Sequence, residues 1–285
     1  MVLTRYRDVA SSLRDPRMRI VGGAADPAAH REMREQARVL YSAERIREWV
    51  PQFGTSARDL ATALAGEIEL VRDFAEPWSM SVAALVTGLS VVEARGLALQ
   101  AQRIFDAGSS PDDESLKTAS GHATVQLSSR FHPDAAALHT QAFVALAVSL
   151  PAFLGNAWLA LLENRSEFDW IGERTAVDEL LRFAGPSLTQ LRVDEDGQRI
   201  ELRLAEANRD PNEFEHPDRL DLRRQDATAH LAFGGGPHAC VGGPLIKAAA
   251  AAVLPIFTER FTSARLIRSE RYGGSAIRGH RVYVI

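Results

Sequence analysis

The sequence predicts a mostly helical protein with small β-sheets at its margin. Apolar residues recur at the three- to four-residue spacing of a helix face through most of the chain. Strand-like pieces are few and short. The composition is even along 285 residues, without a repeat or a low-complexity linker, and 46% hydrophobic content suits a sizeable core. We therefore predict one domain that spans residues 1–285.

The expected elements follow in chain order. Helical periodicity predicts helices over residues 6–14, 28–40, 43–51, 57–64, 77–89, 92–107, 135–162, 174–183 and 244–261. Strands are predicted over 188–193, 200–204 and 281–285. The last helix follows Gly242-Gly243-Pro244, and a proline is well placed in the first turn of a helix.

One predicted helix contains an uncharged segment long enough to span a bilayer, residues 141–162. It is interrupted by Ser149, Pro151, Gly155 and Asn156, and aromatic or basic anchors do not flank both ends. We predict a helix buried through the middle of a soluble domain. Pro151 removes a backbone hydrogen bond and should bend it.

Composition narrows the setting of the protein. A single cysteine excludes an internal disulfide framework and favours a cytoplasmic location. The net charge of −4 and a pI near 6.1 argue against nucleic-acid binding over the whole chain. The first residues look like neither a signal peptide nor a membrane anchor.

The most informative stretch is Phe233-Gly-Gly-Gly-Pro-His-Ala-Cys-Val-Gly242, which contains that cysteine. Glycines permit a close approach of the backbone to a flat or bulky group. Cys240 precedes a helix start, whose partial positive charge should favour the thiolate over the thiol. A thiolate is a ligand of iron. The alternative for a lone cysteine is a buried, inert residue on a turn.

This loop resembles the haem-binding loop of the cytochromes P-450, in which Phe-Gly-x-Gly-x-His-x-Cys-x-Gly supplies the proximal cysteinate. The resemblance implies that Cys240 is the metal ligand of a haem b (iron protoporphyrin IX). It also implies cofactor-binding roles for the other defining residues, which are Phe233, Gly234, Gly236, His238 and Gly242. His238 would contact a haem propionate.

Further residues extend the resemblance. His30 and Arg34 lie four residues apart, so one helix face presents both to the same anion. In the family, His-x-x-x-Arg after Asp-Pro holds a haem propionate, and Arg192 falls where another propionate-binding arginine lies. Outside that pattern, a His and an Arg on a polar helix usually form a solvated face.

Glu179 and Arg182, at a spacing of three, would ordinarily be a surface ion pair worth under about 1 kcal/mol. They also match the structural Glu-x-x-Arg of the family. There a Pro-x-Arg supplies a third partner, and Pro217-Asp218-Arg219 implies that Arg219 has this role.

Several departures from the family pattern concern substrate and oxygen. The chain resembles an N-terminally shortened member, and a short turn, 22–26, stands where a long loop roofs the pocket. Gly155-Asn156 sets the register of the central helix, and Val148 then replaces the acid of an acid–alcohol proton relay. Ser149 takes the place of the alcohol as the catalytic candidate, and Leu146 replaces a glycine. Without the acid, a general-acid contribution of about 10²–10⁴-fold would be weakened or rerouted.

The sequence does not support three other kinds of site. The triple glycine is not a phosphate-binding loop, because no Gly-Lys-Ser/Thr follows it, and the histidines lack the paired spacing of a zinc site. A serine-hydrolase site is not indicated either, because the sequence has no Gly-x-Ser-x-Gly elbow.

Three functions stay open. The first is a cytoplasmic haem-thiolate monooxygenase-like oxidoreductase of secondary metabolism, which acts on a small organic substrate with electrons from a ferredoxin-type donor. The second is a haem enzyme without the usual oxygen activation, either driven by peroxide or acting as an isomerase, dehydratase or lyase. The third is a P-450-like auxiliary protein that stabilises a partner enzyme. A homodimer or a partner protein is expected to cover the shortened distal side, and neither nucleic acid nor membrane is expected as a partner.

Overall fold

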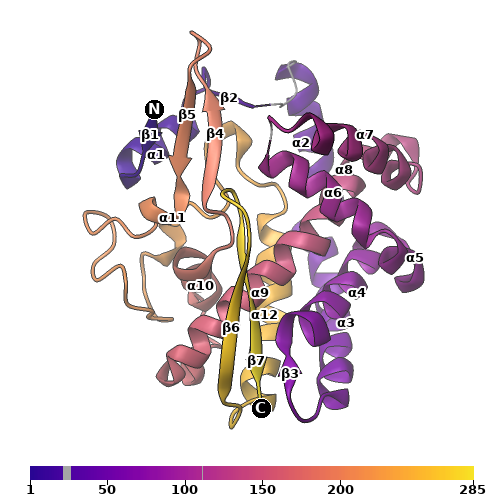
Figure 1. Cartoon of the computed structure of the whole chain (residues 1–285), viewed down its shortest axis with the longest axis vertical. Coiled ribbons are helices and arrows are strands. Elements are labelled where there is room, and N and C mark those ends of the chain that lie inside the picture. Colours follow the sequence, from indigo (N-terminus) through magenta and orange to yellow (C-terminus); the bar gives the residue numbers. More distant parts are fainter. Residues whose placement is uncertain (22–26, 111) are drawn as a thin grey trace.

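Helices form the bulk of the computed structural model, which describes residues 1–21, 27–110 and 112–285 (Figure 1). The longer helices are α1 (Tyr6–Arg14), α2 (Pro27–Leu40), α3 (Ala43–Ala63), α4 (Glu76–Thr87), α6 (Ala98–Ser109), α7 (Glu114–Ser128), α8 (Ala136–Val144), α9 (Leu150–Glu163), α10 (Ala176–Ala184) and α12 (Gly243–Arg260). Shorter helical pieces are α5 (Val91–Gly96), α11 (Leu204–Ala207), η1 (Val71–Ala75), η2 (Pro133–Ala135), η3 (Ala145–Ser149), η4 (Arg165–Trp170), η5 (Ala227–Ala229) and η6 (Gly236–His238). The mainly helical class is confirmed.

Two small sheets complete the described part of the chain. One has the strand order β1-β5-β4-β2, formed by Val2–Leu3, Arg199–Arg203, Thr189–Val193 and Arg19–Ile20. The other has the order β3-β7-β6, formed by Ile68–Glu69, Arg278–Val284 and Leu266–Gly273. Of these strands only β1 pairs in parallel, with β5. Figure 1 shows the β6–β7 hairpin between the α1–β4–β5 side and the helices α2 to α8.

The long central helix runs from Pro133 to Glu163 and joins η2, α8, η3 and α9. Its α9 part is buried from Leu150 to Leu162, as expected for a helix through the core. By length and composition it could cross a membrane, but 78% of its most apolar window is buried inside the protein. The single helix predicted over 135–162 is therefore confirmed in its extent, with a π-helical segment, η3, directly before the turn that contains Pro151.

Apolar side chains gather in two clusters. The larger contains Trp78, Phe153, Trp158 and Phe257 and joins α3, α4, α9, α10 and α12. The smaller lies where α1 packs on β5 and α11, around Tyr6 and Phe214. The expectation of a single domain stays a prediction.

Three expected elements were wrong. The helices predicted over 43–51 and 57–64 are one helix, α3, which passes through Pro51; its packing along α12 outweighs the lost hydrogen bond. The helix predicted over 92–107 is divided at Leu97 into α5 and α6. The prediction missed α7, whose start is capped by Asp113, and β6, whose residues are mostly exposed and lack a clear alternation.

Candidate functional site

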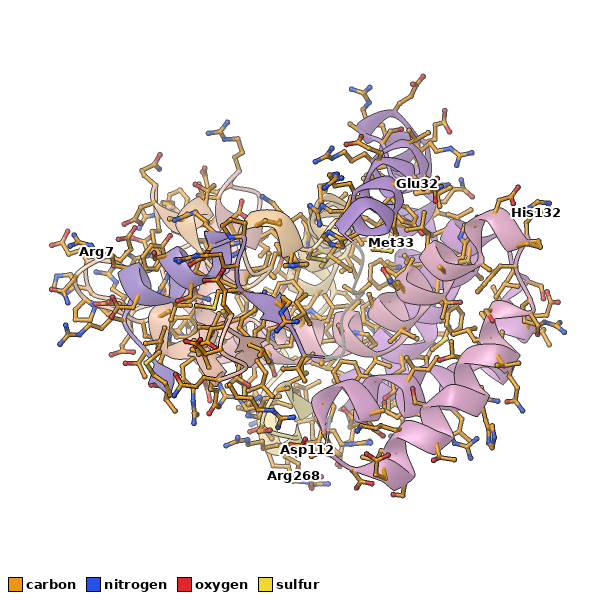
Figure 2. All side chains as sticks on the ribbon, turned by 90° about the horizontal axis from the view of Figure 1, so that it is seen from above. Arg7, Glu32, Met33, Asp112, His132 and Arg268 are labelled. Atoms are coloured by element: carbon orange, nitrogen blue, oxygen red, sulfur yellow. The ribbon has the colours of Figure 1, made fainter. Side chains whose placement is uncertain are left out.

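A cavity of about 510 Å³ lies between three walls. One wall is α2, the second is the central helix at α8 and η3, and the third is the cysteine loop with the start of α12. Its lining is mainly apolar and consists of Ile20, His30, Met33, Arg34, Ala37, Tyr41, Leu138, Gln141, Ala142, Ala145, Leu146, His238, Ala239, Cys240, Val241, Gly242, Leu245 and Ile246. In Figure 2, Met33 lies on the side of α2 that faces the neighbouring helix, while Glu32 points outward. The predicted turn over 22–26 lies outside the described residues.

Cys240 points into this cavity from the third wall. Its backbone N–H donates to the Phe233 carbonyl oxygen at 2.9 Å, which closes the loop around the motif. The cysteine lies deep in the protein, and it keeps an exposed surface because it opens on the cavity.

The charge state of the thiol differs from the expectation. Burial raises the pKa of the Cys240 thiol, and this outweighs the backbone N–H groups of Gly242 and Gly243 and the charge of Arg34, all of which lower it. The helix start alone therefore does not produce a thiolate. A cation at the sulfur would be needed to stabilise the deprotonated form.

Two loop glycines lie against other segments of the protein, and their cofactor-binding role stays a prediction. Gly236 has φ +64°, and a Cβ there would collide with the backbone of Leu13 at the end of α1. Gly234 has φ +69° and lies against the side chain of Gln190. Both shape the loop against its neighbours. Neither they nor Phe233 line the cavity, whereas His238, Cys240 and Gly242 do.

The two α2 residues predicted to act together meet the cysteine loop. Arg34 donates through Nη1 to the Ala239 carbonyl oxygen at 2.7 Å. The rings of His30 and His238 lie 4.5 Å apart, centre to centre. The sequence spacing of His30 and Arg34 thus places both at the cavity, and their shared binding of an anion stays a prediction.

Arg192 on β4 is only 2% exposed. Its guanidinium donates to the Gln190 side-chain oxygen at 2.9 Å and to the Leu191 carbonyl oxygen at 3.3 Å. Among the described residues it has no ion pair with a carboxylate, and burial lowers its pKa. A buried cation without a counterion is costly, so this site suits a bound anion.

His238 completes a group of basic side chains at one edge of the cavity. Burial lowers its pKa, and the charges of His30, Arg192 and Arg34 lower it further. The lining described here contains no Asp or Glu. An anionic group at this edge would relieve the mutual repulsion.

Glu179 and Arg182 on α10 form a buried ion pair, with 2.7 Å between the Arg182 Nε and the Glu179 Oε2 and both side chains fully buried. The third partner is Arg224, whose Nε lies 3.2 Å from Glu179, and not Arg219. Arg219 is exposed and offers only its carbonyl oxygen to the two arginines. The family spacing misled the prediction because two further arginines follow Arg219 within five residues.

The sequence reasoning missed a second buried cluster, which supports the loop. Asp178 accepts from Lys247 at 2.7 Å and lies 3.2 Å from the His230 ring. The ring of His230 packs 5.6 Å from Phe233. Asp178 is next to Glu179 in the sequence and His230 precedes the motif, but the spacing alone gave no signal that they meet.

On the central helix, Leu146 lines the cavity and is 1% exposed. Val148 and Ser149 are half-buried at the end of η3 and are not among the lining residues. The polar side chain that this helix brings to the cavity is Gln141, whose Nε2 lies 3.7 Å from the Met33 sulfur. The catalytic role of Ser149 stays a prediction.

These features fit a flat, apolar group with an anionic edge. The walls are apolar, one edge carries His30, Arg34 and His238, and the thiol of Cys240 faces the interior. Arg192 is not a lining residue, but it lies close enough to His238 for its charge to lower the pKa of that ring. A group of three or more His, Cys, Asp or Glu side chains that could hold a bare metal ion is not found among the described residues.

No protein-family model matches the chain. Cytochrome P450 CYP107DY1 of Priestia megaterium is 26% identical over 301 positions, which cover 89% of this chain and 73% of that protein. Cytochrome P450 119 of Sulfurisphaera tokodaii is 28% identical, but that match spans 36% of its length. In fold, the chain matches P450BioI, solved in complex with a hexadec-9Z-enoic acid-ligated acyl carrier protein. That match has a TM-score of 0.90 at 20% identity and covers 99% and 91% of the two chains.

Proposed function

The chain belongs to the cytochrome P-450 superfamily, and from this premise we propose that it is a haem-thiolate oxidoreductase that inserts oxygen into a small, largely apolar organic substrate. The observation that carries the proposal is the cavity itself, in which Cys240 faces apolar walls beside three basic side chains, His30, Arg34 and His238, with Arg192 near His238. Bound there, haem b would supply oxygen or peroxide activation at its iron.

Different residues would bind the iron and the propionates of the haem. Cys240 would give its Sγ to the iron and lose its proton on binding, because the metal replaces the proton as the cation at the sulfur. The N–H groups of Gly242 and Gly243 would stay directed at the sulfur and limit its basicity. Arg34, Arg192, His30 and His238 would bind the propionates, and the buried charge of Arg192 would gain its missing counterion.

The remaining lining residues would select the substrate. Leu138, Ala142, Ala145 and Leu146 offer apolar surface and exclude water. Gln141 offers the substrate an amide, because the only hydrogen bond of its side chain within the described residues is a weak one to Met33. A small apolar molecule with one hydroxyl or carbonyl group suits this arrangement.

A peroxide-driven reaction is the second candidate. It is favoured by the lack of a carboxylate among the described lining residues and by Val148 where the acid is expected. Ser149 would then hold a water molecule near the cavity without an acid to resupply its proton. The third candidate is a P-450-like auxiliary protein that stabilises a partner enzyme. In a form without haem, it gives no reason for a buried Arg192 that pairs with no carboxylate among the described residues.

The test supplies haem-loaded protein with 7-ethoxycoumarin as a fluorogenic probe. One arm adds a ferredoxin, its reductase and NADPH; the other adds hydrogen peroxide alone. Dealkylation with the ferredoxin system supports the monooxygenase, and dealkylation with peroxide alone supports the second candidate. Haem-loaded protein that is inert in both arms, towards this probe and a panel of small apolar alcohols and ketones, contradicts both oxidative proposals.

The proposed function also implies protein partners. A ferredoxin-type donor would dock on the side of Cys240 and α2, and a second copy or a partner protein would cover the distal side. Light scattering tests the second expectation, which a monodisperse monomer contradicts.

A further inference from the structure

Away from the cavity, basic side chains gather where the β6–β7 hairpin meets the end of α10. The register of the hairpin pairs Arg271 with His280 and Gly273 with Arg278, so Arg271, Arg278 and His280 lie on one face. Arg209 reaches the same place, because its Nη2 donates to the Phe183 carbonyl oxygen at 2.8 Å and its guanidinium lies 4.0 Å from the Phe183 ring centre. The backbone N–H of Arg278 donates to the Pro186 carbonyl oxygen at 2.9 Å, which fixes the hairpin against this end of α10.

The cluster lacks compensating negative charge. Among the described residues, Arg271 and Arg278 form no ion pair with a carboxylate, and Arg209 has only the exposed Asp218 at 2.6 Å. The C-terminal end of α10 adds a partial negative charge of about half a unit. Three guanidinium groups therefore keep more than one positive charge in excess.

Arg278 shows most clearly what the excess positive charge costs the protein. Its Nε is buried and has no hydrogen-bond partner. Burial lowers its pKa, and the charges of Arg271 and Arg209 lower it further. His280 is held by Asn156 at 2.9 Å through its Nδ1, and burial together with Arg278 and Arg271 lowers its pKa. An unsatisfied buried donor and clustered like charges both cost stability, which a ligand of opposite charge recovers.

On the other face of the same hairpin, the arginines are paired with carboxylates. There Arg268 pairs with Glu270 and lies 3.6 Å from the Tyr283 ring centre, and Arg281 pairs with Glu69 at 3.4 Å. Charge balance on one face and its absence on the other distinguish this cluster from a merely arginine-rich strand.

We propose that Arg271, Arg278 and Arg209 form a binding site for a phosphate group, either free phosphate or a monoester on a larger molecule. The planar guanidinium groups suit the oxygens of phosphate, and a divalent anion matches the excess charge. None of the three arginines lines the haem cavity, so the site does not depend on the proposed haem chemistry.

The experiment titrates inorganic phosphate into the full-length, haem-loaded protein by calorimetry at constant ionic strength. Wild-type protein should bind one phosphate per chain. Arg271→Gln, an exposed position, should weaken binding by about tenfold or more, while the control Arg268→Gln should leave it unchanged. Glycerol phosphate in a second arm distinguishes the sources, since equal binding of both probes means that the phosphate group alone is recognised.

Thermal unfolding provides a readout that separates binding from a structural role. Without phosphate, Arg271→Gln should unfold at the wild-type temperature or higher, because it relieves repulsion. Phosphate should raise the unfolding temperature of the wild type and not that of the variant. The proposal is overturned by a wild type without saturable phosphate binding, by an equal loss of affinity in Arg268→Gln, or by a variant that is destabilised without phosphate.

Discussion

Replacing Glu179 by glutamine should destabilise the protein far more than an isolated ion pair would suggest. Glu179 accepts from Arg182 at 2.7 and 2.9 Å, from the Asp221 backbone N–H at 3.1 Å and from Arg224 at 3.2 Å. Glutamine keeps the shape of the side chain but removes its charge. Two largely buried guanidinium groups then lose the carboxylate that they share.

The expected magnitude follows from burial. Breaking a buried pair by neutralising one partner costs about 3–5 kcal/mol, because the remaining charge stays out of water without compensation. Arg182 also donates to the carbonyl oxygens of Asn208 and Pro217, both at 2.8 Å, so it cannot swing out to solvent without losing them. A domain is stable by about 5–15 kcal/mol in total, so this loss is a large fraction.

Urea unfolding followed by circular dichroism measures the change. The matched control is Glu114→Gln, whose carboxylate also pairs at i,i+3, with Lys117 at 2.7 Å, but on an exposed face. The control should lose less than about 1 kcal/mol. A Glu179→Gln variant that loses no more than Glu114→Gln would refute the reasoning from burial.

Three further predictions concern the cavity. Arg192→Met should leave the haem-free protein at least as stable as wild type, and it should weaken haem binding by about tenfold or more because one charge-assisted contact is lost. A melting curve measures the stability and a haem titration the affinity; unchanged haem affinity contradicts the propionate role. The pKa of His238 is lowered below its ordinary 6.5, so the unfolded chain binds the proton more readily than the folded chain, and the folded protein loses stability as the pH falls below 6.5. His238→Gln should therefore make the free energy of unfolding of the haem-free protein less dependent on pH on the acid side. An unaltered pH dependence would count against this reasoning. Because the pKa of the Cys240 thiol is raised, iodoacetamide should alkylate the haem-free protein near pH 8 more slowly than it alkylates a free thiol, and bound haem should protect the cysteine. An alkylation rate above that of the free thiol would contradict the raised pKa.

The sequence predicted those features that depend on local spacing. The helix over 6–14 matches α1, and His30 and Arg34 meet the cavity because four residues make about one helical turn. The cysteine loop and the helix after it were found because Gly and Pro punctuate them so strongly.

The features that sequence did not predict depend on contacts between distant segments. Arg224 rather than Arg219 completes the Glu179 pair, since the choice among neighbouring arginines is made by the path of an irregular segment. The roles of Gly234 and Gly236 depend on Gln190 and Leu13, which lie far away in the sequence. The raised pKa of Cys240 depends on burial, which no local pattern records.

The assignment of Cys240 is tested most directly by a haem titration with the reduced carbon-monoxide difference spectrum, on wild type and Cys240→Ser side by side. The account predicts one haem per chain and the long-wavelength Soret band of a thiolate ligand in the wild type, and loss of that band in the variant. A folded wild-type protein that holds no stoichiometric haem, or a variant with an unchanged spectrum, would contradict it.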